Sequence, residues 1–325
     1  MRAIVIKKYG GPEALEIEER PDPKPEEGQV VIEVKAFGVN HAESYMRQGT
    51  WAEIDEISGI ECVGIVRSDP SGRLRAGQKV VAFMGGMGRT TGGSYAELTR
   101  VPSSNVVPIE TDLPWEDLAA IPESYATAWA CLFGNLKLTA GQTIVIRGAS
   151  SSLGQAAVNI AAHAGAHVIA TSRSTARTDM LLKLGAKEVL IDGSDLSARL
   201  RAQRPEGVDA VLELVGNATV LDSLKMVRPD GHLCQAGWLG GLEPIADFNP
   251  IAHLPSRVHY SLFGSFVFGT PGFPVSDIPM QTIVDRVAAG AYQAKPVKVF
   301  HFEQIQEAHR LMDRGKAGGK MVVRL

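Results

Sequence analysis

The chain has 325 residues, of which 45% are hydrophobic, and a formal net charge of −3. Because this length exceeds what one hydrophobic core usually holds, we expect two domains. The near-neutral charge predicts no general affinity for nucleic acid or for an anionic membrane, and no apolar run is long enough to span a bilayer.

The first third of the chain has the pattern of short strands separated by turns. Its first apolar run, Ala3–Ile6, begins so early that it leaves no room for a signal peptide, so we expect a cytoplasmic protein. Four further β-rich runs follow, with Gly- and Pro-rich segments between them: Val30–Ala36, Val63–Val66, Lys79–Phe83 and Ser94–Thr99. Closely spaced strands with this punctuation are typical of an irregular barrel or sandwich.

The rest of the chain has the pattern of alternating strands and helices. A predicted helix, Trp115–Leu132, precedes apolar runs typical of a parallel sheet: Thr143–Ile146, His167–Thr171, Glu188–Ile191, Ala210–Leu214, His232–Gly237 and His259–Phe263. The last elements are two helices, Met280–Gly290 and Glu303–Arg314, and two strands, Val297–Phe300 and Met321–Leu325. We therefore predict an α/β fold with a Rossmann-type doubly wound parallel sheet in residues 121–265. This domain would be inserted between residues 1–120 and 266–325 of a β-rich catalytic domain.

Residues 143–171 have the pattern of one βαβ unit with a phosphate-binding turn. The run Thr143–Ile146 enters a small-residue turn, and a helix is predicted over Gln155–Ala164. Small residues let the backbone approach a pyrophosphate, and the N–H groups of the helix N-terminus point toward it. The candidate cofactor-binding residues are Gly148, Ala149, Ser151, Ser152, Leu153 and Gly154, with Ser151 where a glycine is expected. The alternative is an ordinary loop that binds nothing.

The end of the second strand of this unit indicates which dinucleotide binds. NAD sites usually place an acidic residue there for the ribose 2′-hydroxyl, whereas NADP sites use a cation. Here Ser172 and Arg173 end the strand, Arg177 follows, and the first acidic residue is Asp179. One helical turn would place both guanidinium groups on one side, and Ser172 could add a hydroxyl donor. We predict NADP(H); the alternative is that both arginines are only solvated.

Several further motifs, in order along nearly the whole chain, resemble a known family. They are GVNHAESY at 38–45, GIECVGIV at 59–66, GGSYAE at 92–97, LVG at 214–216 and GGKMVV at 318–323. With the βαβ turn, they make the chain similar to the medium-chain dehydrogenase/reductase superfamily, in its zinc-independent (zeta-crystallin-like) quinone oxidoreductase branch. The resemblance implies that the β-rich domain is GroES-like.

The residues at the family's zinc positions predict that no metal is bound. Zinc-dependent members have a cysteine where this chain has Asn40 and a histidine where it has Ile60. Isoleucine has no lone pair, and a neutral amide is a poor zinc ligand. The structural zinc lobe is absent too, and the three cysteines (Cys62, Cys131 and Cys234) have no paired spacing.

The resemblance also implies residues of the active site. Tyr45 and Asn40 are the candidates for catalytic hydrogen-bond donors to a developing oxyanion, with Asn40 more suited to positioning cofactor or substrate. The remaining cofactor-binding candidates are Thr127, Leu214, Val215, Gly216, Gly237, Trp238 and Lys320. Each polar candidate has a structural alternative: a turn-forming Asn40, a half-buried Tyr45, a backbone-bonded Thr127 and a solvated Lys320.

The predicted activity is NADPH-dependent, zinc-independent hydride transfer to a quinone or an α,β-unsaturated carbonyl. The expected partner is a small, apolar carbonyl or quinone substrate, with no nucleic acid and no membrane. The run His259–Phe263 resembles the edge strand through which family members pair, so we expect a homodimer. Two alternatives stay open: reduction of an enoyl thioester or alkenal, and an NADPH-binding protein with little turnover.

Overall fold

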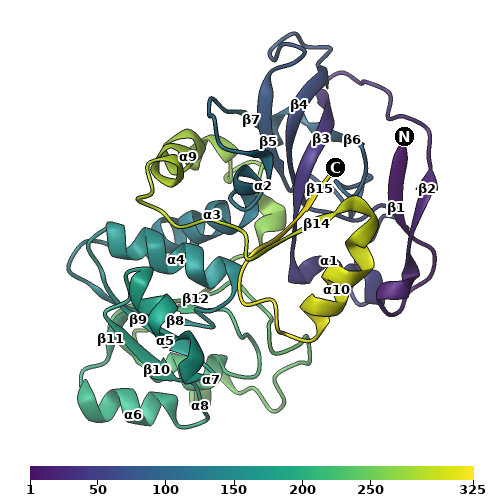
Figure 1. Ribbon diagram of the computed structural model, residues 1–325. Coiled ribbons are helices and arrows are strands. Elements are labelled where there is room, and N and C mark those ends of the chain that lie inside the picture. The colour runs from purple at the N-terminus through teal and green to yellow at the C-terminus, as the bar shows by residue number, and fades with distance from the viewer. The chain divides into compact units, whose positions relative to one another are not determined.

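The computed structural model describes residues 1–325 and divides into two units (Figure 1). Unit 1 consists of Met1–Ala126 and Ser265–Leu325, and unit 2 is the uninterrupted stretch Thr127–Gly264. The chain thus leaves the first unit, builds the second and returns to complete the first.

Unit 1 is built on a mostly antiparallel sheet with the strand order β14-β15-β3-β4-β5-β7, in which β6 also pairs with β3. The strands are β3 (Gln29–Val39), β4 (Glu61–Ser68), β5 (Lys79–Phe83), β6 (Leu98–Pro102), β7 (Val106–Pro108), β14 (Lys298–His301) and β15 (Met321–Arg324). A separate hairpin pairs β1 (Arg2–Ile6) with β2 (Leu15–Glu19). The helices are α1 (His41–Gln48), α2 (Trp115–Leu118), α3 (Pro122–Trp129, which crosses the boundary into unit 2), α9 (Met280–Ala288) and α10 (Ile305–Asp313).

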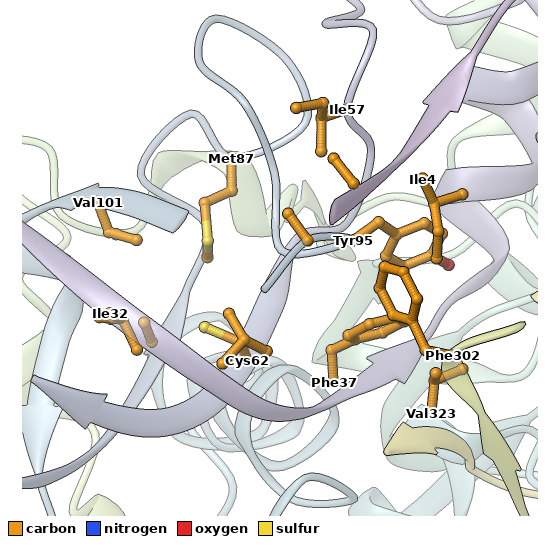
Figure 2. Packing of buried hydrophobic residues seen from close by; sticks show 14 of the residues in the cluster. Ile4, Ile32, Phe37, Ile57, Cys62, Met87, Tyr95, Val101, Phe302 and Val323 are labelled. Carbon is orange, nitrogen blue, oxygen red and sulfur yellow. The ribbon is translucent and has the colours of Figure 1, made fainter. Parts of the chain in front are cut away.

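The core of unit 1 joins residues that lie far apart in the sequence (Figure 2). Phe37 of β3 stacks on Tyr95 with ring centroids 4.6 Å apart. Phe302 and Val323, from the C-terminal segment, are buried in the same cluster. The two chain segments of unit 1 therefore share one hydrophobic core.

Unit 2 is a six-stranded parallel sheet with the order β10-β9-β8-β11-β12-β13. Its strands are β8 (Thr143–Arg147), β9 (His167–Ser172), β10 (Glu188–Ile191), β11 (Val208–Glu213), β12 (Val227–Gln235) and β13 (His259–Leu262). The helices are α4 (Ser152–His163), α5 (Thr178–Lys183), α6 (Leu196–Gln203), α7 (Val220–Leu224) and α8 (Pro250–His253). The chain adds strands outward from β8, then crosses to β11 and continues on the other side. This order confirms the predicted doubly wound α/β fold.

Among the predicted elements that differ from the structure, two do so for an identifiable reason. The expected helix Trp115–Leu132 is divided into α2, α3 and a π-helical segment, Ala130–Asn135. Pro122 accounts for the break between α2 and α3, because proline cannot continue a helix and begins a new one here. The expected strand Ser94–Thr99 begins only at Leu98. The N–H groups of Ser94 and Tyr95 donate instead to the carbonyls of Gly59 and Ser58, at 3.1 and 3.0 Å. No helix of the chain combines the length and the apolar character that a membrane crossing requires.

Candidate functional site: the dinucleotide turn of unit 2 and the buried polar cluster of unit 1

The turn after β8 depends on two glycines. Gly148 has φ of +83°, and a Cβ at this position would lie 3.2 Å from Leu214 Cβ. A Cβ at Gly154 would lie 2.5 Å from the carbonyl oxygen of Gly148, closer than any real contact. Glycine at both positions therefore allows α4 to begin directly against the turn, as a dinucleotide site requires.

Ser151, which stands between Gly148 and Gly154 where a glycine is expected, caps α4. Its hydroxyl oxygen accepts from the N–H of Gly154 at 3.1 Å, and its hydroxyl donates to the carbonyl of Gly148 at 2.9 Å. Ser152 and Leu153 form the first turn of the helix, and Ala149 is fully buried in the turn. The first N–H groups of a twelve-residue helix thus face the end of β8, where an anion is favoured.

The loops after β11 and β12 come together beside this turn. Glu213, the last residue of β11, accepts from the N–H groups of Val215 and Gly216 at 2.7 and 2.9 Å, and its burial raises the pKa of the carboxyl. A Cβ at Gly237 would lie 2.4 Å from the carbonyl oxygen of Leu214. The predicted residues Leu214–Gly216, Gly237 and Trp238 are therefore close to one another, at the carboxyl edge of the sheet where ligands of such folds bind.

The end of β9 presents two arginines, although not as the sequence suggested. The strand ends at Ser172, and Ser174 caps a short 3₁₀ helix, Thr175–Arg177. Arg173 therefore precedes the helix, and the expectation that one helical turn aligns Arg173 with Arg177 is wrong. Arg173 is exposed, Arg177 is half-buried, and neither forms an ion pair or a side-chain hydrogen bond within the chain. The hydroxyl of Ser172 donates to the carbonyl of Ser174 at 3.0 Å, so it is not the free donor that we expected.

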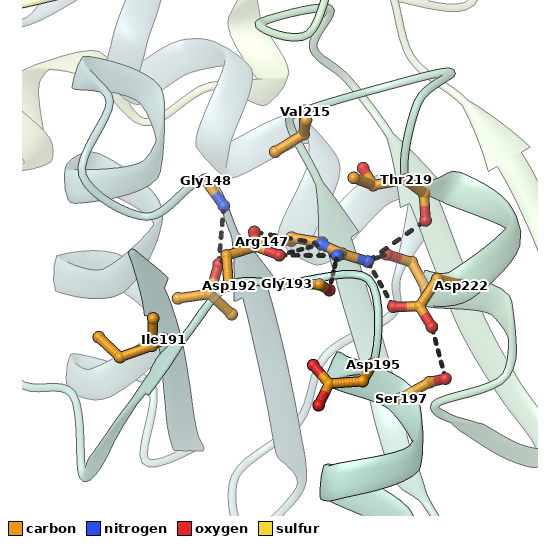
Figure 3. Close-up of polar contacts among 12 residues, drawn as sticks. Arg147, Gly148, Ile191, Asp192, Gly193, Asp195, Ser197, Val215, Thr219 and Asp222 are labelled. Carbon is orange, nitrogen blue, oxygen red and sulfur yellow. Dashed lines mark hydrogen bonds and ion pairs between the residues drawn. The ribbon is translucent and has the colours of Figure 1, made fainter. Parts of the chain in front are cut away.

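A buried arginine that the sequence analysis did not single out lies beneath the turn (Figure 3). Arg147, the last residue of β8, is only 1% exposed. Its guanidinium forms ion pairs with Asp192 at 2.7 Å and with Asp222 at 2.8 Å. The sequence does indicate a buried charge here, because Arg147 ends an otherwise apolar strand. The two aspartates that pair with Arg147 could not be identified from the spacing of residues.

In unit 1, four polar side chains form a buried cluster. Lys320 donates to Asn40 Oδ1 at 2.6 Å and forms an ion pair with Glu61. Asn40 Nδ2 donates to Glu61 Oε1 at 2.9 Å and to Glu43 Oε1 at 3.2 Å. Glu43 and Glu61 are fully buried, and Lys320 is 6% exposed. Glu43 and Glu61 are structural partners that the sequence analysis did not assign.

This cluster revises the predicted roles of Asn40 and Lys320. Both N–H bonds of the Asn40 amide are directed at carboxylates, so the expectation that this amide donates to an oxyanion is wrong for this arrangement. Its backbone N–H donates to Glu43 Oε2 at 2.7 Å, which completes the capping box of α1. The ammonium of Lys320 is held by Asn40 and Glu61 and is not solvated. Contact between Lys320 and a cofactor phosphate stays a prediction.

Tyr45 and Thr127 lie on helices α1 and α3. Tyr45 is half-buried; its ring meets His41 edge-on at 4.9 Å between centroids and is nearly parallel to Trp51 at 6.2 Å. Burial raises the pKa of the Tyr45 phenol, so the phenol stays protonated at neutral pH and can donate a hydrogen bond. Thr127 is 4% exposed within α3.

Two stretches of the chain match known protein families. Residues 26–111 match the alcohol dehydrogenase GroES-like domain, and residues 152–277 match the family described as zinc-binding dehydrogenase.

Similar proteins include both sequence relatives and solved structures. The quinone oxidoreductase of Rattus norvegicus is 30% identical over 273 residues, which cover 82% of this chain and 81% of the relative. A mycobacterial protein solved in complex with NADPH superposes with a TM-score of 0.88 at 24% identity and covers all of both chains. The enoyl reductase CurK superposes with a TM-score of 0.83 at 24% identity, covering 99% of this chain and 98% of that one.

The residues of this chain do not fit the zinc that one family description implies. No group of three or more His, Cys, Asp or Glu side chains gathers as a metal site would. Asn40 Oδ1 accepts from the Lys320 ammonium, whose positive charge opposes a divalent cation at the same atom. Ile60 is buried and carries no donor atom.

Proposed function

This chain belongs to the quinone oxidoreductase branch of the medium-chain dehydrogenase/reductase superfamily, and from that premise we propose that it is an NADPH-dependent, metal-independent reductase of quinones or α,β-unsaturated carbonyls. The observation that carries the proposal is the pairing of the Gly148–Gly154 turn with two arginines at the end of β9. The turn suits a pyrophosphate, and an unpaired guanidinium suits a 2′-phosphate. The mycobacterial neighbour solved with NADPH supports the same choice of cofactor.

In this proposal each unit has a separate task. The α4 N-terminus, with the Gly148 turn, binds the pyrophosphate, and Arg173 and Arg177 bind the 2′-phosphate. The bound dinucleotide supplies the hydride. Tyr45 presents its phenolic O–H to the acceptor oxygen on which negative charge develops, which is a form of electrostatic stabilisation. Asn40 holds the Lys320–Glu61 pair and fixes the start of α1, the helix that carries Tyr45.

NADPH oxidation, followed by absorbance, tests the proposal. The panel contains a benzoquinone, a naphthoquinone, an alkenal and an enoyl thioester, with NADH and EDTA as controls. Turnover of a quinone or an alkenal that prefers NADPH and is unaffected by EDTA is the expected result. NADPH binding without turnover of any acceptor would contradict the proposed reaction, and a preference for NADH would contradict the proposed cofactor.

Enoyl reduction is the second candidate function, because the fold neighbour CurK is described as an enoyl reductase. Both reactions deliver hydride to a conjugated carbon while charge develops on a carbonyl oxygen. The two differ in the acceptor, so the enoyl thioester in the panel discriminates them. A higher kcat/KM for the thioester than for every quinone would favour this second function.

We also propose that the chain forms a homodimer and acts in the cytoplasm. Strand β13 is the last strand of the unit 2 sheet, and Tyr260 and Leu262 on it are 40% and 55% exposed. An unpaired edge with exposed apolar side chains favours pairing with a second copy. Sedimentation at micromolar concentration tests the dimer, and a monomer there would contradict it. The three cysteines are buried and form no disulfide, which is compatible with a reducing compartment.

A further inference from the structure

Arg147 connects the two sides of the dinucleotide turn through one guanidinium. On one side, Nε and Nη2 both donate to Asp192, at 3.1 and 2.7 Å, and Nη2 also donates to the carbonyl of Gly193 at 3.1 Å. On the other side, Nη1 donates to Asp222 at 2.8 Å and to the carbonyl of Thr219 at 3.3 Å. Figure 3 shows the guanidinium extended between these two groups. It is therefore a fixed cation that cannot itself reach a ligand.

Asp192 lies directly beside the end of β9. Its backbone N–H donates to the carbonyl of Ser172 at 2.9 Å, and the preceding residue, Ile191, is paired with Ser172 in the sheet. The next residue after Ser172 is Arg173, the proposed ligand of the 2′-phosphate. Asp192, the residue after β10, thus places a carboxylate beside the strand end at which NAD-binding and NADP-binding sites differ in charge.

A short chain of hydrogen bonds also connects Asp192 to the turn. Thr171 Oγ1 donates to Asp192 Oδ2 at 3.3 Å, and the same hydroxyl oxygen accepts from the N–H of Gly148 at 3.1 Å. The orientation of the Asp192 carboxylate therefore affects both the strand end and the first glycine. Without Arg147, this carboxylate would carry an uncompensated negative charge beside the proposed phosphate position.

We infer that Arg147 is a positioning residue that sets the cofactor preference, by neutralising Asp192 and holding it beneath the turn. With Asp192 paired, the end of β9 presents the positive charge of Arg173 to a 2′-phosphate. Without Arg147, the unpaired Asp192 carboxylate would repel a phosphate. It could instead accept a hydrogen bond from a 2′-hydroxyl, as the acidic residue of an NAD site does. The inference rests on the proposed function, because it concerns the preference between the two dinucleotides.

Two double variants with the same formal charge test this inference. Both remove the guanidinium through Arg147→Gln, and each then neutralises one of its two partners, through Asp192→Asn or Asp222→Asn. Removing one carboxylate with the cation limits the destabilisation that two unpaired buried acids would cause. The Kd values for NADPH and NADH are measured by fluorescence titration, with thermal unfolding of each protein as the control for folding.

The double variant that keeps Asp192 should lose its preference for NADPH. We expect R147Q/D222N to bind NADPH about tenfold more weakly and NADH within about threefold of wild type, as repulsion between a carboxylate and a phosphate in a partly solvated site predicts. R147Q/D192N should keep both Kd values within about threefold. Arg147→Lys, which keeps the charge without the planar fork, should retain most of the preference.

The possible failures are distinguishable. A ratio of the NADPH and NADH Kd values that stays at its wild-type value in both double variants would overturn the inference and leave Arg147 a purely structural residue. A wild-type protein that binds neither dinucleotide, or that binds NADH as tightly as NADPH, would overturn the proposed cofactor preference itself. Selectivity that changes equally whichever aspartate is neutralised would refute the specific role of Asp192.

Discussion

Glu43 allows a quantitative test of the buried cluster in unit 1. Its carboxyl is fully buried, and burial raises its pKa from 4.5 to about 7, against the opposing effect of Lys320. Between these two values the carboxyl keeps its proton in the folded chain and loses it in the unfolded chain. Since the unfolded chain then binds fewer protons, this group lowers the free energy of unfolding as the pH rises through that window.

The change Glu43→Gln removes this titration and keeps the size of the side chain. One pKa unit corresponds to about 1.4 kcal/mol, so the buried carboxyl costs the folded state about 3 kcal/mol above pH 7 and little below pH 4.5. Relative to wild type, the free energy of unfolding of E43Q should therefore rise by about 2–3 kcal/mol between pH 5 and pH 8. Any hydrogen bond that the variant loses changes its free energy of unfolding by the same amount at pH 5 and at pH 8, so it does not affect this difference.

Equilibrium unfolding in urea at pH 5 and pH 8 measures this difference. Glu27→Gln, which removes the same charge at an exposed position, provides the matched control. If the stabilities of E43Q and wild type differ by the same amount at both pH values, Glu43 does not titrate in this range. The account of the buried cluster would then be wrong.

Three further predictions test the dinucleotide site and the chemistry. Arg173→Ala should weaken NADPH binding about tenfold, as loss of a charge-assisted phosphate contact predicts, and NADH binding far less; equal losses in titrations would exclude contact with the 2′-phosphate. Gly154→Ala should abolish dinucleotide binding and destabilise the protein by about 1–3 kcal/mol, because the new Cβ would lie 2.5 Å from the Gly148 carbonyl oxygen. The control is Gly134→Ala, where a Cβ meets nothing within 4 Å, and equal thermal stabilities of the two variants would count against this packing argument. Tyr45→Phe should lower kcat without changing the Kd of NADPH; unchanged steady-state kinetics would remove Tyr45 from the chemical step.

Local pattern was sufficient to predict the parallel sheet and the turn of unit 2. The strand of residues 188–191 has the predicted bounds, and a turn that begins at Gly148 joins β8 to α4 as expected, although α4 begins at Ser152, three residues before the predicted start. These features depend on contacts between neighbours in the sequence: apolar runs make strands, and small residues permit a close approach. The helix break at Pro122 was also local and could have been predicted.

The polar networks could not be predicted, because their members are distant in the sequence. Glu61 and Lys320 are 259 positions apart and pair only after β15 has joined the sheet of unit 1. Arg147 meets its two aspartates across 45 and 75 positions. A charged residue within an apolar strand indicates a buried partner but does not identify it. The same limit explains why the role of Asn40 was predicted incorrectly. Its amide was expected to be open to a ligand, but Glu61 and Lys320, which bind it, are distant in the sequence.

The insertion of unit 2 into unit 1 has a consequence for the order of folding. Strand β15 lies between β14 and β3 in the sheet, yet the ribosome makes it after all of unit 2. The inserted unit can therefore fold as one continuous stretch during synthesis. Until β15 has been made, the part of β3 that pairs with it remains without a strand partner. Chaperone binding or aggregation during expression should depend on how long that part of β3 stays unpaired. Lys320 directly precedes β15, so the buried cluster can form only after nearly the whole chain has been synthesised.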